Sequence, residues 1–165
     1  MKIPIVGLAQ GIHEFDFVEE VSSCGLADHP NLNRPIEIKV YLEKRSTSLY
    51  LRNRVRTVGR FPCDRCLAEF DLAFGDEGRI VFTSDPDLLA YSNDEVHTLE
   101  KDAREINLTD DVRDLLLLSV PAKLLCAEDC KGLCPGCGVN LNSEECHCAP
   151  RPVDSRWQGL QKLMK

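Results

Sequence analysis

The sequence predicts an α+β protein in which β-strands dominate and a cysteine-rich element follows them. Alternating apolar and polar residues occupy much of the first two-thirds of the 165 residues, as in strands that bury one face. Six of the nine cysteines lie between Cys126 and Cys148. We therefore expect an antiparallel sheet or a partly open barrel with one or two short helices in residues 1–125. Residues 126–165 should form a cysteine-rich element with a short C-terminal helix packed on it.

The middle of the chain predicts two pairs of strands. Residues 36–43 alternate between apolar and polar side chains, and after turn residues 46–48 the same period continues through residues 49–61. The short polar link predicts an antiparallel hairpin. The side chains expected to face outward on its second strand are Tyr50, Arg52, Arg54 and Arg56. Residues 67–74 and 78–83 predict a second hairpin, and residues 2–20 one or two opening strands.

Helical patterns come later in the chain. The acidic residues 85–104 follow no clear period, which predicts a long surface loop. A helix should begin near Thr109-Asp110, where carboxylates suit the positive helix start, and end before Pro121. Residues 154–164 predict a short final helix because their apolar side chains share one face. That face would carry Trp157, Leu160 and either Leu163 or Met164.

Charge is unevenly distributed. The net charge of −7 argues by itself against a general nucleic-acid binder. Residues 34–66 nevertheless hold nine Lys and Arg against three Asp and Glu, whereas residues 67–114 hold four against fourteen. A basic stripe on a strand face is therefore a candidate RNA-binding surface, as is typical of phosphate-contacting proteins. Its residues would be Arg45, Arg52, Arg54, Arg56 and Arg60. Alternatively, these arginines pair with the acidic segment within the same fold.

The cysteine spacing favours structural zinc. Residues 134–138, Cys-Pro-Gly-Cys-Gly, have the form of a zinc knuckle, in which two thiolates point the same way and a glycine permits a tight turn. Residues 63–66 repeat the Cys-x-x-Cys spacing. Eight cysteines then divide into two sets of four, which predicts one or two zinc ions per chain. The first set is Cys63, Cys66, Cys126 and Cys130. The second set is Cys134, Cys137, Cys146 and Cys148.

Other arrangements of the cysteines remain open. Four thiolates also suit an iron–sulfur cluster, and His147 could replace a neighbouring cysteine. A redox dithiol at Cys63 and Cys66 lacks the βαβ context typical of such motifs, and disulfides would need an oxidising compartment. Cys24 is expected to be a buried, inert thiol. A single-site alternative would use Cys130, Cys134, Cys137 and either Cys146 or Cys148.

We expect no enzymatic activity, no small-molecule substrate and no membrane association. Four thiolates would fill every zinc position and reduce the Lewis acidity needed to activate water. The sequence contains no HExxH helix motif, Gly-rich phosphate loop or GxSxG turn. Its apolar runs fall far short of the ~20 residues that a membrane helix needs. The N-terminal segment has no secretory signal pattern, so a cytoplasmic location is expected.

Several motifs together point to one family. C-x-R-C-L corresponds to residues 63–67, and a Leu-rich stretch ends at Pro121. The pattern C-K-G-L-C-P-x-C-G-x-N-L-N, followed by C-x-C, spans residues 130–148. A late D-P-R-W pattern is matched by residues 154–157, with Ser155 where proline is usual. On these motifs the chain resembles the YceD family, whose members are implicated in the accumulation of large-subunit ribosomal RNA.

The resemblance implies a non-enzymatic ribosome biogenesis factor that supports synthesis, processing or stability of large-subunit (23S) ribosomal RNA. Its partner would be ribosomal RNA, a ribosomal protein or an assembly intermediate. The alternative is an acidic adaptor or chaperone-like module that binds a basic ribosomal protein through residues 67–114, without RNA contact. For Arg65, inside the first Cys-x-x-Cys, we expect a structural role, because its guanidinium can offset the charge of a four-thiolate zinc site.

Overall fold

The computed structural model describes residues 1–90, 95–149 and 156. Two short helices and a single 3-10 turn accompany the strands of this part of the chain: η1 (Val21–Cys24), α1 (Pro86–Ala90) and α2 (Thr109–Leu118). The strands are β1 (Lys2–Pro4), β2 (Gly11–Glu19), β3 (Ile36–Lys44), β4 (Ser48–Pro62), β5 (Glu69–Phe74), β6 (Glu77–Thr83), β7 (Val96–Thr98) and β8 (Glu105–Asn107).

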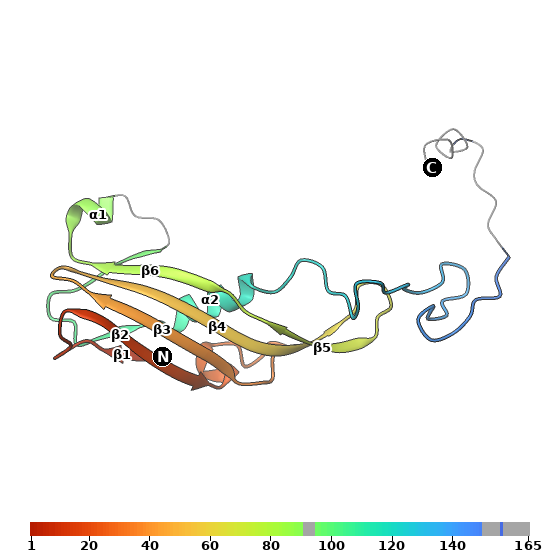
Figure 1. The fold of residues 1–165 in the computed structure, drawn as a ribbon, viewed down its shortest axis with the longest axis horizontal. Coiled ribbons are helices and arrows are strands. Elements are labelled where there is room, and N and C mark those ends of the chain that lie inside the picture. The colour runs from red at the N-terminus through yellow and green to blue at the C-terminus, as the bar shows by residue number, and fades with distance from the viewer. Residues whose placement is uncertain (91–94, 150–155, 157–165) are drawn as a thin grey trace.

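An open sheet dominates the molecule (Figure 1). Its strands follow the order β2-β3-β4-β6-β7, and β5 pairs with the second half of β4. All neighbours are antiparallel except β6 and β7, which are parallel. A separate antiparallel pair joins β1 and β8. The predicted β-rich α+β class is confirmed, with an open sheet and not a barrel.

The long strand β4 organises the sheet. Its 15 residues alternate between buried and exposed positions, so that Leu49, Leu51 and Val55 face the core while the arginines face outward. The antiparallel register pairs it with β3 from Glu37 opposite Arg56 to Lys44 opposite Leu49. The predicted hairpin over residues 36–61 is therefore confirmed, including its inward and outward faces. The outward side of β4 is the surface on which the sequence places its basic stripe.

The second predicted hairpin is wrong, because β5 and β6 do not pair with each other. Both run antiparallel to β4, with Phe74 opposite Thr57 and Glu77 opposite Arg54. Gly75 and Asp76 lie between them as a kink and not as a turn, and the Asp76 carbonyl accepts a hydrogen bond from the Val55 N–H at 3.0 Å. A Cβ at Gly75 would lie 2.0 Å from the Val55 carbonyl oxygen, so only glycine allows this approach. β4, β5 and β6 thus form one long, kinked hairpin.

The core lies on the inner face of the sheet, beneath α2 and η1. Val112 and Leu116 of α2 are fully buried, and α2 packs against β4 and η1. The predicted helix is confirmed, beginning at Thr109 and ending at Leu118. Asn53 of β4 also faces this core: it has no exposed surface, and neither polar atom of its side chain has a hydrogen-bond partner within the part of the chain that the structure describes. A polar side chain therefore lies buried without a hydrogen-bond partner in the described part of the protein.

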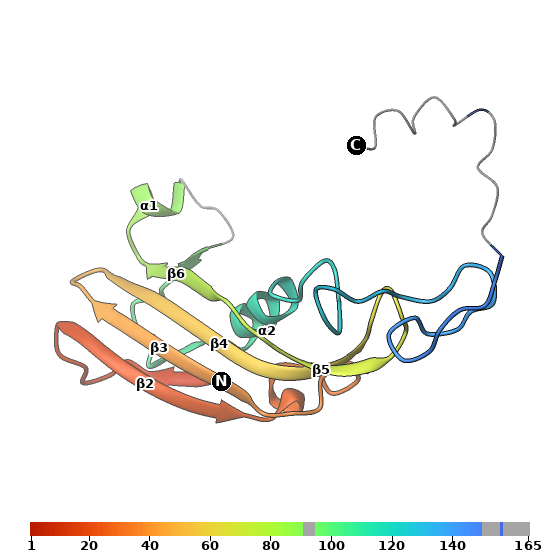
Figure 2. The same cartoon turned by 45° about the vertical axis from the view of Figure 1, so that its right-hand side comes forward.

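Two other predictions concern the later segments. The loop expected over residues 85–104 contains the short helix α1 and the strand β7, which pairs with β6. The helix expected over residues 154–164 lies outside the described residues, apart from Arg156. The cysteine-rich segment continues from the end of the sheet where β4 and β5 meet, as Figures 1 and 2 both show. This end of the molecule holds the candidate site.

Candidate metal centres

The first Cys-x-x-Cys forms the turn of the long hairpin. β4 ends at Pro62 and β5 begins at Glu69, so residues 63–68 connect them. The Cys63 N–H donates to the Ala68 carbonyl at 2.9 Å, which closes the end of the ladder, and the Leu67 N–H donates to the Cys63 carbonyl at 2.9 Å. The Arg65 N–H points at the Cys63 sulfur at 3.4 Å. A knuckle of this kind presents both thiols on one side of the turn.

The tail supplies two further thiols, which complete a group that we call the front cluster: Cys63, Cys66, Cys126 and Cys130. Cys63 Sγ lies 3.8 Å from Cys130 Sγ, and Cys66 Sγ lies 3.6 Å from Cys126 Sγ. Arg65 holds the same segment, because its Nη1 donates to the Cys130 carbonyl at 2.8 Å and to the Glu128 carbonyl at 3.3 Å. These contacts give Arg65 a positioning role beside the front cluster.

Backbone contacts tie the tail to the hairpin turn on both sides of the front cluster. The Asp64 N–H donates to the Leu124 carbonyl at 2.8 Å, and the Leu124 N–H donates back to the Asp64 carboxylate at 2.7 Å. Further along, the Leu133 N–H donates to the Arg65 carbonyl at 3.1 Å. The segment before Cys126 and the segment after Cys130 are therefore both fixed to the tip of the sheet.

The knuckle of residues 134–138, the rear knuckle, repeats the backbone geometry of the knuckle of residues 63–67, the front knuckle. The Gly138 N–H donates to the Cys134 carbonyl at 2.9 Å, and the Gly136 N–H points at the Cys134 sulfur at 3.3 Å. The residue after the second cysteine is left-handed in both knuckles, with φ of 76° at Gly138 and 61° at Leu67. Two segments about 70 residues apart in the chain thus adopt one local structure, which is the structure that directs N–H groups toward sulfur.

Both groups of sulfurs have the dimensions of a four-thiolate metal site. The second group, the rear cluster, consists of Cys134, Cys137, Cys146 and Cys148. Within each cluster the four Sγ atoms lie within 4.8 Å of one another. In the rear group Cys146 Sγ lies 3.2 Å from Cys134 Sγ and 3.7 Å from Cys137 Sγ. A tetrahedral zinc with Zn–S bonds of about 2.3 Å places its sulfurs about 3.8 Å apart. A disulfide needs about 2.05 Å, and all nine cysteines are free thiols. The donor set and its spacing fit zinc.

Crowding of the thiols separates their pKa values. Burial raises the pKa of Cys63, but hydrogen bonds from the Cys126, Cys66 and Arg65 N–H groups outweigh it and lower the pKa to about 6. Hydrogen bonds from the Cys137 and Gly136 N–H groups likewise lower the pKa of Cys134 to about 6. The neighbouring thiols then raise the pKa of Cys126 to about 12. Each cluster can therefore keep one of its cysteines as a thiolate without a metal. Several thiolates in one cluster repel one another and need a bound cation to offset their charge.

The two groups differ in exposure. Cys63, Cys66 and Cys130 of the front cluster are buried, each with 5% or less of its surface exposed, beneath partly buried Phe70, Leu125 and Leu133. In the rear cluster only Cys134 is buried. The front cluster is thus embedded between hairpin and tail, and the rear cluster is open to water.

The structure assigns each predicted ligand to one group. The single-site alternative is wrong in its use of Cys130, whose sulfur lies with the front cluster. His147 is exposed and belongs to neither group of donors. Cys24 is fully buried in the core. Its pKa is raised, mainly by burial and to a smaller extent by the negative charge of Glu19, as expected of an inert thiol.

Carboxylates neutralise most of the basic stripe. Arg52 and Arg54 share Glu77 at 3.6 and 2.9 Å, and Arg60 pairs with Glu69 at 2.7 Å. These two partners belong to the acidic segment, as in the alternative reading of the sequence. Arg45, in the turn after β3, instead pairs with Glu43 at 2.9 Å and stacks over Tyr50 at 4.7 Å. Four of the five predicted arginines therefore already have an acidic partner.

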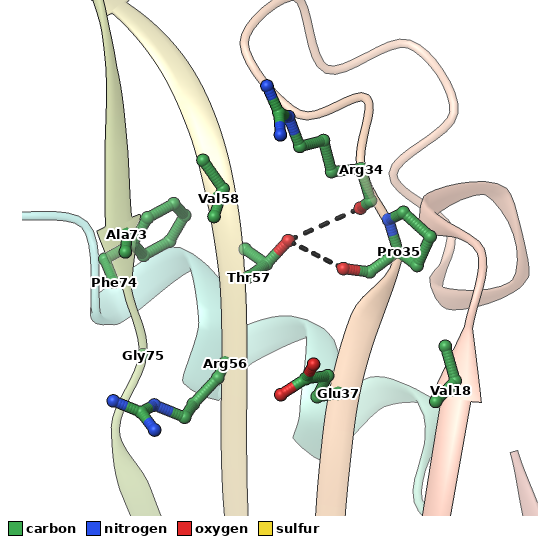
Figure 3. A pocket seen from close by; sticks show the side chains of 10 residues that line it. All are labelled: Val18, Arg34, Pro35, Glu37, Arg56, Thr57, Val58, Ala73, Phe74 and Gly75. Atoms are coloured by element: carbon green, nitrogen blue, oxygen red, sulfur yellow. Dashed lines mark hydrogen bonds between the residues drawn. The ribbon is translucent and has the colours of Figure 1, made fainter.

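Arg56 differs from the other four arginines. No ion pair joins it to any side chain in the described ranges, although Glu37 lies opposite it on β3. Figure 3 shows its guanidinium turned toward Gly75 and away from Glu37. It lines a surface hollow of about 710 Å³ together with Val18, Val58 and Ala73. On the outer face, Arg56 is the member of the stripe whose charge remains available.

Among the described residues, no helix is both long enough and apolar enough to cross a membrane.

The fold and the clusters define a small α+β protein whose long hairpin meets its tail at one four-thiol group, with a second four-thiol group inside the tail. The family described as "Large ribosomal RNA subunit accumulation protein YceD" matches residues 51–164, and the chain belongs to this YceD family. The match includes both knuckles and the whole of the cysteine-rich segment.

Curated relatives support the assignment. The chain is 25% identical to large ribosomal RNA subunit accumulation protein YCED homolog 1, chloroplastic, of Arabidopsis thaliana, over 82% of this chain and 50% of that relative. The Zea mays protein of the same name is 31% identical over 78% of this chain and 52% of its own length. An uncharacterized protein of Mycobacterium tuberculosis is 33% identical over 66% of this chain and 51% of its own length. The chain spans about half the length of the curated relatives it matches. No solved structure matches it significantly.

Sequence reasoning missed two residues of the site. The sequence places Asn142 only in the Asn-Leu-Asn of the family pattern, yet its amide donates to Cys130 Sγ in the other cluster at 3.3 Å. Leu67 was noted only as part of a family motif, and its left-handed backbone was not expected. Aligning the two knuckles on their cysteines places Leu67 opposite Gly138, which is the signal that predicts this conformation. No local pattern predicts the Asn142 contact, because the contact depends on how the two knuckles pack.

Proposed function

We propose that this protein supports the accumulation of large-subunit ribosomal RNA as a non-enzymatic factor stabilised by two structural zinc ions. The family match over residues 51–164 is the observation that carries the ribosomal role. The plant relatives bear the same description in their names. Zinc would be structural because each group supplies four sulfurs, which leaves no position for a reacting water. The front metal would fasten the tail to the hairpin and the rear metal would close the loop inside the tail, while partners bind elsewhere.

A depletion experiment tests the ribosomal role. Cells lacking the protein should contain less large-subunit than small-subunit ribosomal RNA, measured as the ratio of the two mature species. The wild-type gene should restore the ratio, and a Cys63→Ser, Cys66→Ser variant should not, because its tail would be unfastened. A Cys24→Ser variant is the matched control, since Cys24 lies outside both clusters. An unchanged ratio on depletion would contradict the proposed role.

Metal analysis tests the zinc separately. The purified full-length chain should contain two zinc ions and no iron, and it should lack the visible absorption of an iron–sulfur cluster. Purified protein that is folded and metal-free, with every thiol reactive, would contradict this part of the proposal and leave the ribosomal role to the depletion experiment.

A second candidate is an adaptor that binds a basic ribosomal protein without touching RNA. The carboxylate partners of Arg45, Arg52, Arg54 and Arg60 favour it, because they leave little free positive charge on the outer face. Crosslinking in cells, followed by identification of both RNA and protein partners, separates the candidates. Ribosomal RNA fragments would support direct contact, whereas a single small basic protein would support the adaptor.

A further inference from the structure

Asn142 belongs to the rear element but contacts the front one. It lies in the loop between Cys137 and Cys146, and its Nδ2 donates to Cys130 Sγ of the front cluster at 3.3 Å. Its Oδ1 accepts the Lys131 N–H at 2.8 Å. The amide therefore holds the backbone next to Cys130 and the sulfur of Cys130 at once. A thiolate that binds metal can still accept such a hydrogen bond, and outer contacts of this kind tune metal affinity.

The rear knuckle fixes the position of Asn142. The Cys134 N–H donates to the Val139 carbonyl at 2.8 Å, and the Leu141 N–H donates to the Gly132 carbonyl at 2.9 Å. Asn140 then holds Asn142 directly, because its Oδ1 accepts both the Asn142 N–H at 3.0 Å and the Asn142 Nδ2 at 2.8 Å. These contacts hold Asn142 within the loop that begins at Cys137 and ends at Cys146, two cysteines of the rear cluster.

We propose that Asn142 couples the two metal sites, so that metal in the exposed rear site raises the affinity of the buried front site. The proposal rests on the zinc binding proposed above. Thermodynamic linkage makes the coupling reciprocal: front-site metal strengthens the rear site by the same factor. Asn142 is a positioning residue in this scheme, because it binds no metal itself.

The difference in exposure sets the order of events. Cys137 and Cys148 of the rear site are exposed, so a chelator reaches this site first. Removal of the rear metal frees the loop, and Cys130 then loses a hydrogen-bond donor. The buried front site consequently binds its metal less tightly. Loss of metal is therefore stepwise, rear before front, and the first step weakens the second site.

The test is a double-mutant cycle on the full-length chain loaded with zinc. Zinc release is titrated with a chelator in the wild type, Cys148→Ser, Asn142→Ala and the double variant. Cys66→Ser removes a front-site thiol, so the zinc-release step that is missing from the titration of this variant is the front-site step. Asn142→Ala should lower front-site affinity about 10–100-fold, the usual effect of losing an outer contact to a ligand. Cys148→Ser should lower front-site affinity in the wild type and have little further effect in Asn142→Ala.

Two further variants keep the test specific. Asn142→Asp retains an oxygen for the Lys131 N–H but removes the donor to Cys130, so it should lower front-site affinity as Asn142→Ala does. Wild-type front-site affinity in Asn142→Asp would mean that Asn142→Ala acts by distorting the loop, and would overturn the coupling. Ser143→Ala is the control, because among the described residues the Ser143 hydroxyl bonds only the Asn140 carbonyl, at 3.4 Å, so its loss should leave both steps unchanged. With cobalt(II) as the probe, the thiolate-to-metal charge-transfer band of the front site should shift in both Asn142 variants.

The outcomes separate this inference from the proposed function. Additive effects of Cys148→Ser and Asn142→Ala on the front-site step, with two zinc ions bound, would overturn the coupling and leave structural zinc intact. A wild type that binds no zinc would overturn both. A front-site step that weakens with Cys148→Ser only when Asn142 is present supports the coupling.

Discussion

At the scale of single residues, Asn53 shows a conflict between strand position and side chain. It occupies an inward position of β4 with no exposed surface and no hydrogen-bond partner in the described chain. A buried amide without partners costs about 1–3 kcal/mol relative to its paired state. The sequence period alone identifies position 53 as inward, but it does not reveal that the neighbouring groups offer no partner.

We predict that Asn53→Val stabilises the protein by about 1–2 kcal/mol, because valine suits a strand and leaves no polar atom unpaired. Urea unfolding monitored by circular dichroism measures the change. The control is Asn33→Val at an exposed position outside the strands, which should change stability by less than about 0.5 kcal/mol. Destabilisation by Asn53→Val would mean that the amide has a bonded partner in solution.

Substitutions at the equivalent positions Leu67 and Gly138 should change thermal stability in opposite directions. Left-handed backbone costs a residue with a Cβ about 1–2 kcal/mol, and glycine avoids that cost. Leu67 is also largely exposed, so little burial is lost when it is replaced. Leu67→Gly should therefore raise the thermal midpoint of the zinc-loaded protein, and Gly138→Ala should lower it. If both substitutions lowered the midpoint, packing of Leu67 would outweigh its backbone strain.

At the scale of elements, the hairpin turn and the tail form one unit through the front cluster. We predict that trypsin cleaves after Lys123 much faster in Cys66→Ser than in the wild type, because Leu124 then loses its fixed contact with Asp64. Cys148→Ser should mainly expose Lys131, which adjoins the rear loop. Mass spectrometry of the early fragments distinguishes the two sites. Equal cleavage after Lys123 in Cys66→Ser and the wild type would show that the tail is held by other contacts.

Strand pairing was predictable only where a turn was local. The hairpin of β3 and β4 follows from strict alternation and a short polar link, and the structure has it. Residues 75–77 carry the same kind of turn residues, yet there the chain only kinks, since β4 is long enough to pair with β5 and then β6. The grouping of eight cysteines followed from counting Cys-x-x-Cys pairs, whereas the contact of Asn142 with Cys130 depends on tertiary packing.

At the scale of the whole molecule, charge pairing limits where RNA can bind. We predict that Arg56→Glu weakens binding of a ribosomal RNA fragment more than Arg45→Glu does, since Arg45 already pairs with Glu43. Loss of one phosphate contact should also reduce the slope of log affinity against log salt by about 1. Gel-shift titrations at several salt concentrations measure both quantities. Equal, unchanged affinities in the two variants would favour the adaptor.

The front cluster also has a consequence for how the chain is made. Cys66 and Cys126 are separated by 60 residues. At about 5–20 residues per second, a ribosome needs roughly 3–12 s to add that stretch. The hairpin can form early, but its two thiols must wait for the tail before the four-sulfur site closes. Completion of the front site therefore marks the moment at which nearly the whole described chain has been synthesised.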